Sequence, residues 1–156
     1  MAFVAAAVAV ALTVEAQAAP AADFSDAASP ALYKGFVASG GELANSAAIW
    51  GTEGSITLPR RGTSPADLVL HVYPVIPAGS GPQVVTASLN GTLLGTATVE
   101  RGWRDVRFQA PASAWRAGSN RLDLQCASAS VPSDVGLADD GRHLSLAIRR
   151  VAVVPR

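Results

Sequence analysis

The residues that could take part in chemistry are concentrated in two short polar turns. The first turn covers residues 100–104, where an indole ring stands between arginines. Sugar-binding sites use an aromatic ring that packs on the apolar face of a sugar, and charged side chains that bind its hydroxyl groups. The sequence therefore predicts a ligand-binding set of Trp103 with Arg101 or Arg104.

The second polar turn covers residues 139–143 and offers a weaker set, Asp140 with Arg142. A carboxylate and a guanidinium this close could contact a ligand, but Asp-Asp-Gly is also a common turn, and the arginine could simply pin the loop. Asp134, Asp139 and Asp140 supply the hard oxygen atoms that Ca²⁺ prefers, without the alternating ladder of a dedicated calcium loop. We expect no cofactor, with calcium as the open alternative and no other metal.

Catalytic motifs are absent from the sequence. It contains no Gly-x-Ser-x-Gly turn, and His71 and His143 are its only imidazole bases. Neither has a nucleophile and an orienting group at a suggestive spacing, and no pair of carboxylates has the context of a glycosidase. Cys126 alternates with leucines, which favours a small buried side chain over a nucleophile. The sequence predicts a protein that is not an enzyme.

Short alternating apolar runs, separated by glycine, proline or asparagine, fill the chain from Trp50 onward. This pattern is typical of an all-β, antiparallel, jelly-roll-like β-sandwich, and we count seven or eight strands. Asn90-Gly91 predicts a tight hairpin, because a type I′ turn needs positive φ at both central residues. We expect one helical turn that ends at Gly118, with Trp115 packed over the core. The runs are 68–73, 84–89, 93–99, 106–108, 122–124 and 144–154.

The first 18 residues are a separate apolar segment. Residues 2–14 carry no charge, and as a helix they reach roughly 20 Å, short of the about 30 Å hydrocarbon layer of a membrane. The small residues at 16–18 are typical of a signal-peptide cleavage site, although no Lys or Arg precedes the apolar run. The segment is predicted to be an N-terminal apolar helix, either a signal peptide or a membrane-helix remnant; a cytoplasmic alanine-rich helix is a third alternative.

These boundaries predict three parts and a location. Residues 1–18 are the signal peptide or membrane-helix remnant, 19–48 are a linker and edge segment, and 49–156 are the β-sandwich domain. We expect an extracytoplasmic protein, either secreted, periplasmic or membrane-anchored. Twelve Lys and Arg residues balance twelve Asp and Glu residues. Nucleic acid is therefore excluded as a partner, because phosphate binding needs a concentrated basic face.

Three signals together resemble a known group of sandwiches: the Asn90-Gly91 hairpin, the Gly118-x-Asn120-x-Leu-x-Leu strand, and the Asp140-Gly141-Arg142 turn. The arrangement is similar to galactose-binding-like jelly rolls, and in particular to the extracytoplasmic C-terminal domains of bacterial membrane glycosyltransferases and related envelope proteins. The resemblance implies a non-catalytic accessory or glycan-related binding domain of the bacterial cell envelope. The alternative is a structural or assembly domain that docks onto a membrane protein partner and has no ligand of its own.

Overall fold

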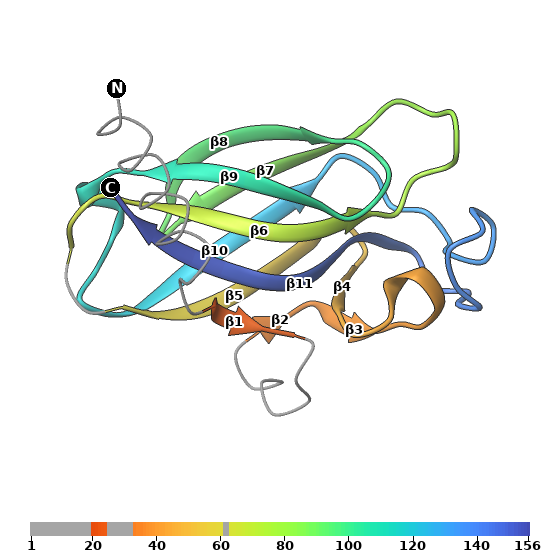
Figure 1. The fold of residues 1–156 in the computed structure, drawn as a ribbon, viewed down its shortest axis with the longest axis horizontal. Coiled ribbons are helices and arrows are strands. Elements are labelled where there is room, and N and C mark those ends of the chain that lie inside the picture. Colours follow the sequence, from red (N-terminus) through yellow and green to blue (C-terminus); the bar gives the residue numbers. More distant parts are fainter. Residues whose placement is uncertain (1–19, 25–32, 61–62) are drawn as a thin grey trace, which may run out of the picture.

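The computed structural model describes residues 20–24, 33–60 and 63–156, which form two packed antiparallel sheets (Figure 1). Sheet A has the order β3 (Phe36–Ala38), β4 (Ala47–Trp50), β11 (Leu144–Pro155), β6 (Ala66–Pro74), β9 (Arg104–Ala110), and β1 (Pro20–Asp23) also pairs with β11. Sheet B has the order β2 (Tyr33–Lys34), β5 (Glu53–Arg60), β10 (Gly118–Cys126), β7 (Gln83–Leu89), β8 (Thr92–Val99). The all-β sandwich expected from the alternating pattern is confirmed.

The described residues hold eleven strands, so the expected seven or eight is wrong. The difference arises where the chain crosses between the sheets. Gly35 has φ +80° and separates β2 in sheet B from β3 in sheet A; Gly51 has φ +78° and does the same between β4 and β5. Only glycine adopts this backbone conformation without strain. Each crossing separates two strands along one stretch of chain, and β1 adds a further strand.

The predicted linker and edge segment, residues 19–48, contributes to both sheets. β1 pairs with the C-terminal half of β11, and the side chains of Ala22 and Phe24 are buried in the core. The 3-10 helix η2 (Gly41–Leu43) buries Leu43 against the outer face of sheet A. The predicted apolar helix at 1–18 lies outside the described residues. Within those that are described, no helix is long and apolar enough to cross a membrane.

Local signals in the sequence set several strand connections. Asn90 and Gly91 have φ values of +50° and +83°, as a type I′ turn requires, and they join β7 to β8. The expected helical turn is present as the 3-10 helix η3 (Ala112–Ala114), but it ends at Ala114, and Gly118, its expected end, begins β10. Trp115 directly after it is 4% exposed. β11 is the long last strand, and its pairing is irregular between Ile148 and Arg150. This irregularity is a β-bulge.

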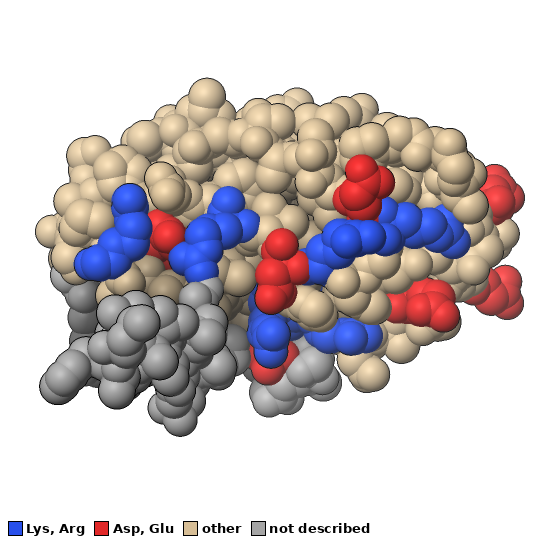
Figure 2. Space-filling view, turned by 45° about the horizontal axis from the view of Figure 1, so that its top comes forward, with Lys and Arg blue, Asp and Glu red and all other residues tan. Residues whose placement is uncertain are grey.

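Charged side chains gather on the outer face of sheet A. Arg107 from β9 and Arg156 beyond β11 both lie against the buried Asp67, with N–O distances of 2.8 and 2.9 Å. Figure 2 shows one face of the molecule on which basic side chains form runs with acidic groups between them. Basic and acidic side chains therefore alternate on this face, and Arg107 and Arg156 are paired with a carboxylate.

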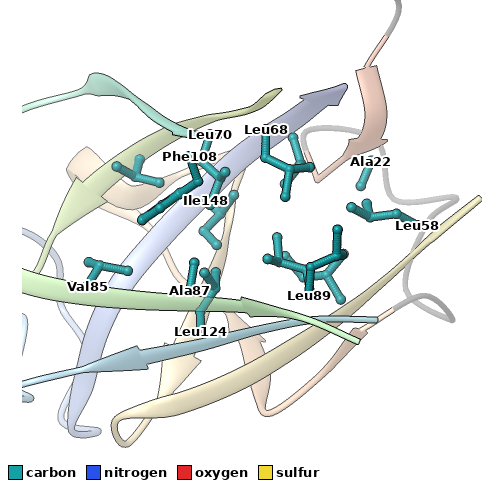
Figure 3. Packing of buried hydrophobic residues seen from close by; sticks show 14 of the residues in the cluster. Ala22, Leu58, Leu68, Leu70, Val85, Ala87, Leu89, Phe108, Leu124 and Ile148 are labelled. Carbon is teal, nitrogen blue, oxygen red and sulfur yellow. The ribbon is translucent and has the colours of Figure 1, made fainter. Parts of the chain in front are cut away.

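The main core lies between the two sheets and is built from leucine, isoleucine, valine and alanine (Figure 3). β7 shows the cause most clearly, because its residues alternate between buried and half-buried along the whole strand. Successive side chains of a strand point to opposite faces, so one face enters the core and the other stays at the surface. The outer face of sheet B therefore carries the polar side chains of its strands and is open to solvent.

Candidate functional site

A groove of about 420 Å³ runs across the outer face of sheet B. The residues that line it come from β2, β5, β10 and β7, together with Gly35. Most of them carry hydroxyl, amide, carboxylate or cationic groups. The lining consists of Lys34, Gly35, Glu53, Gly54, Ser55, Thr86, Ser88, Arg121, Asp123, Leu124 and Gln125.

The alternation of β10 positions the central part of this groove. Leu122 and Leu124 are buried, so Arg121, Asp123 and Gln125 project from the opposite face of the same strand. The Arg121 Nε lies 2.8 Å from an Asp123 carboxylate oxygen, and the two side chains stay 69% and 38% exposed. This ion pair leaves further guanidinium donors and carboxylate lone pairs available to a ligand.

Charge in the groove is balanced, since Lys34 and Arg121 oppose Glu53 and Asp123. The β10–β5 register places Gln125 opposite Glu53 and Asp123 opposite Ser55. The groove therefore presents donors and acceptors side by side over several residues, with no net charge. Such a surface can hydrogen-bond a ligand that is rich in hydroxyl groups. The lining contains neither histidine nor cysteine, and no aromatic ring.

The predicted ligand residue Trp103 lies on the other sheet and is half-buried. The Arg149 guanidinium lies 3.9 Å from the centre of its ring, the His71 ring stacks on it at 5.3 Å, and Tyr73 meets it edge-on. The indole Nε1 donates a hydrogen bond to the Glu42 carbonyl, 3.2 Å away. The ring is thus largely engaged by protein groups.

The two arginines predicted beside Trp103 bind backbone carbonyl groups. Arg101 donates to Ile76 and Val135, at 2.9 and 3.0 Å, and so ties two loops to its own turn. Arg104 donates to the carbonyls of Glu100 and Arg101, within the same turn. These contacts position the loops at one end of the sandwich.

Asp140 and Arg142, the second predicted set, lie together and bind each other. Arg142 donates through Nε and through a terminal nitrogen to the two oxygens of Asp140, at 3.0 and 2.7 Å, and Ser39 adds a hydrogen bond of 2.9 Å. Hydrogen bonding by Arg142 holds the pKa of Asp140 well below its usual range, and Asp140 raises that of Arg142. Arg142 also binds the Ala38 carbonyl, so the pair fixes the loop before β11.

Trp50 is the exposed aromatic ring of the described chain, with 59% of its surface accessible. It ends β4, and the Arg142 guanidinium lies 6.0 Å from the centre of its ring. Its backbone amide donates to the carbonyl of Gly35, a residue that also lines the groove. The exposed indole therefore belongs to the chain segment that borders one end of the groove.

The remaining chemical candidates are separate from one another. His71 binds Asp105 through Nδ1 at 2.8 Å, whereas His143 is exposed. Within the described residues, no three His, Cys, Asp or Glu side chains are close enough to hold a metal ion. Cys126 is buried, and this burial raises its pKa to about 11, so its thiol stays protonated at neutral pH.

Sequence reasoning missed the groove, although part of its signal was present. The alternation of Arg121, Asp123 and Gln125 marks a polar strand face, but the pairing of β10 with β5 and β7 supplies the other walls. Exposure of Trp50 had no sequence signal, because apolar residues precede it in its strand.

No protein-family model and no curated protein sequence matches this chain. Solved structures do. A family 35 carbohydrate binding module from Clostridium thermocellum is similar over 79% of this chain and 90% of that one, at 12% identity and a TM-score of 0.51. An acetyl xylan esterase from the rumen bacterium Butyrivibrio proteoclasticus is similar over 86% of this chain but only 32% of its own, at 11% identity and a TM-score of 0.51.

These similarities identify the fold. The chain shares the two-sheet β-sandwich fold of these two structures, as expected from its alternating strand pattern. It covers nearly the whole of the Clostridium thermocellum chain and about a third of the esterase chain.

Proposed function

We propose that this chain is a non-catalytic carbohydrate-binding domain and that its ligand lies in the groove of sheet B. The observation that carries the proposal is the lining of this groove, in which hydroxyl, amide, carboxylate and cationic side chains stand side by side with no net charge. Sugar hydroxyl groups donate and accept hydrogen bonds at once, and such mixed surfaces satisfy both roles. The ligand class is a neutral polysaccharide or oligosaccharide.

The structural similarities support this proposal. The Clostridium thermocellum protein is by its name a carbohydrate binding module, and it is covered almost completely by this chain. We further propose an extracytoplasmic, envelope-associated location and an accessory role like that of the domains of membrane glycosyltransferases. Both rest on the apolar segment at 1–18 and on the strand motifs described above.

Affinity electrophoresis of the full chain in gels that contain neutral polysaccharides tests the proposal. Gln125→Ala removes an exposed groove side chain from β10, and Gln109→Ala removes the same group from the exposed face of β9 on the opposite sheet. Loss of a hydrogen bond that contributes about 1 kcal/mol weakens binding about fivefold. We expect this loss for Gln125→Ala and unchanged retardation for Gln109→Ala.

Two results would contradict the proposal. If xylan, mannan, galactan and β-glucan gels all fail to retard the chain, neutral polysaccharides are not its ligands. If both glutamine variants weaken polysaccharide binding equally, the groove is not the binding site. Glu53 and Asp123 both lie in the groove, so release of reducing sugar from a retained polysaccharide would overturn the non-catalytic part.

A second candidate function, docking onto a membrane protein partner, is favoured by β8. This strand is an edge strand of sheet B, its sequence Thr92–Val99 carries no charge, and Leu93 is 66% exposed. Uncharged edge strands pair readily with other chains. If β8 docks a partner, a partner protein co-purifies from membranes with the full chain and is lost with Leu93→Lys; recovery of the chain alone in both cases would count against it.

A further inference from the structure

A second pocket, of about 240 Å³, lies on the outer face of sheet A. Its lining consists of Asp23, His71, Arg149 and Arg150, from β1, β6 and β11. The registers of the sheet place Arg150 opposite Asp23 on one side and opposite His71 on the other. Three adjacent strands therefore form one polar concavity, on the opposite sheet from the groove.

A β-bulge explains why two consecutive arginines enter the same pocket. Neighbouring residues of a regular strand point to opposite faces. The register of β11 with β6 shifts between Ile148 and Arg150, and both Ile148 and Val151 are buried in the core. The two residues between them, Arg149 and Arg150, both line the outer pocket. A bulge redirects side chains in this way, frequently beside functional sites.

The guanidinium groups of this pocket retain unused donors. Arg149 packs on Trp103 and donates one hydrogen bond to the Ala44 carbonyl at 3.0 Å, but its buried Nε has no hydrogen-bond partner. Arg150 is exposed, and its side chain has no ion pair or hydrogen bond with the described residues. The exposed Arg150 guanidinium is therefore the group that offers free donors to a ligand in the pocket.

Charge and size define the acceptor. Two arginines and one aspartate give the pocket a net charge of +1, and His71 is already bound to Asp105 through Nδ1. A formal net charge of +1 is matched by a monoanion, whereas a dianion would leave one negative charge uncompensated. The volume is several times the roughly 30 Å³ that a water molecule occupies in the liquid, so the pocket admits more than a bare ion.

We propose that this pocket binds a monoanionic ester oxyanion, either a sulfate monoester or a phosphodiester. Guanidinium groups form paired, charge-assisted hydrogen bonds with such oxygens, and Arg149 and Arg150 approach the pocket from adjacent positions of one strand. The proposal is independent of the neutral-carbohydrate groove, because the two sites lie on opposite sheets and share no residue.

The test is a ¹H–¹⁵N NMR titration of the full chain with methyl sulfate and with dimethyl phosphate, at constant ionic strength. The reporter is the Trp103 indole N–H, whose ring lies directly beneath Arg149. We expect a saturable shift. Arg150→Gln weakens binding about tenfold or more, as the loss of a charge-assisted hydrogen bond predicts. Asp23→Asn strengthens binding, because it removes the opposing carboxylate.

Arg116→Gln is the matched control, since Arg116 is an exposed arginine in the loop before β10 and outside the pocket. Its removal lowers the net charge by the same amount and leaves binding unchanged. A shift that never saturates, or equal weakening by Arg150→Gln and Arg116→Gln, overturns the proposal. So does Asp23→Asn binding more weakly than the unmodified chain.

Two further arms separate the sources of the ester. Flotation with phosphatidylglycerol vesicles, compared with phosphatidylcholine vesicles, reports a lipid phosphodiester. Retardation in a gel that contains a sulfated galactan reports a sugar sulfate. In either arm, the proposal is supported if Arg150→Gln abolishes binding and Arg116→Gln preserves it. If binding survives Arg150→Gln, the proposal is wrong for that source of the ester.

Discussion

Asn120 carries the most informative stability prediction. It is the first buried residue of β10, and only 1% of its surface is exposed. Its Oδ1 accepts hydrogen bonds from the Arg116 amide at 2.7 Å and from Asn90 Nδ2 at 2.8 Å. Its Nδ2 donates to the carbonyls of Arg116 and Gly118, both at 3.0 Å. One side chain thus joins the β7–β8 hairpin to the loop before β10.

Replacement of Asn120 by alanine leaves four polar groups without their partner. A hydrogen bond contributes about 1 kcal/mol net to folding, which gives an upper value near 4 kcal/mol. Residues 116 and 118 are exposed, so water can recover part of this loss at their backbone groups. We expect Asn120→Ala to lower the free energy of unfolding by about 3 kcal/mol, which corresponds to roughly 6–12 °C in Tm for a domain of this size.

Urea unfolding followed by tryptophan fluorescence measures this change. Ser119→Ala is the control, because Ser119 is exposed and adjacent, and it should alter stability by less than about 0.5 kcal/mol. Asn120→Asp is the sharper variant, since it keeps the acceptor but places an oxygen against two carbonyls. A loss below about 1 kcal/mol for Asn120→Ala, or full stability of Asn120→Asp, would refute the reasoning.

Three further predictions concern other buried contacts. Because hydrogen bonding by Arg142 lowers the pKa of Asp140, this pair stabilises the fold at neutral pH and loses its effect as pH falls. The difference in free energy of unfolding between the unmodified chain and Asp140→Asn should therefore narrow below about pH 4, as measured by denaturation at several pH values. Burial raises the pKa of the Cys126 thiol to about 11, so its reaction with a disulfide reagent at pH 8 should be about two orders of magnitude slower in the native protein than in urea. A Cβ on Gly54 would lie 2.6 Å from the Phe36 ring, so Gly54→Ala should lower the free energy of unfolding by about 1–3 kcal/mol in urea denaturation.

Local backbone rules were sufficient for part of the fold. The Asn90-Gly91 turn was predictable because its φ values depend on two residues alone. The alternation in β10 also assigned Cys126 correctly to the buried face of that strand. Strand number was not predictable. At Gly35 and Gly51 the chain crosses from one sheet to the other, and nothing in the flanking residues says which sheet receives each half.

The candidate sites depended on tertiary structure to a greater extent. The groove unites side chains from four strands, and its lining extends over 91 positions of the sequence, from Lys34 to Gln125. Trp103 was singled out from its polar neighbours, yet Arg149 and His71 reach its ring from two other strands. A sequence pattern identifies only the neighbours of a residue along the chain, whereas its contacts in the fold come from distant segments.

The sequence by itself determined that this chain is an antiparallel β-sandwich with tight turns, because period-two alternation and positive-φ residues act within a few positions. Only the tertiary structure decided where a ligand can bind. Strand pairing assembled a neutral groove on sheet B, and a single bulge in β11 directs the side chains of both Arg149 and Arg150 to one pocket on sheet A. Both results arise from register between strands, which is a long-range property that no local pattern carries.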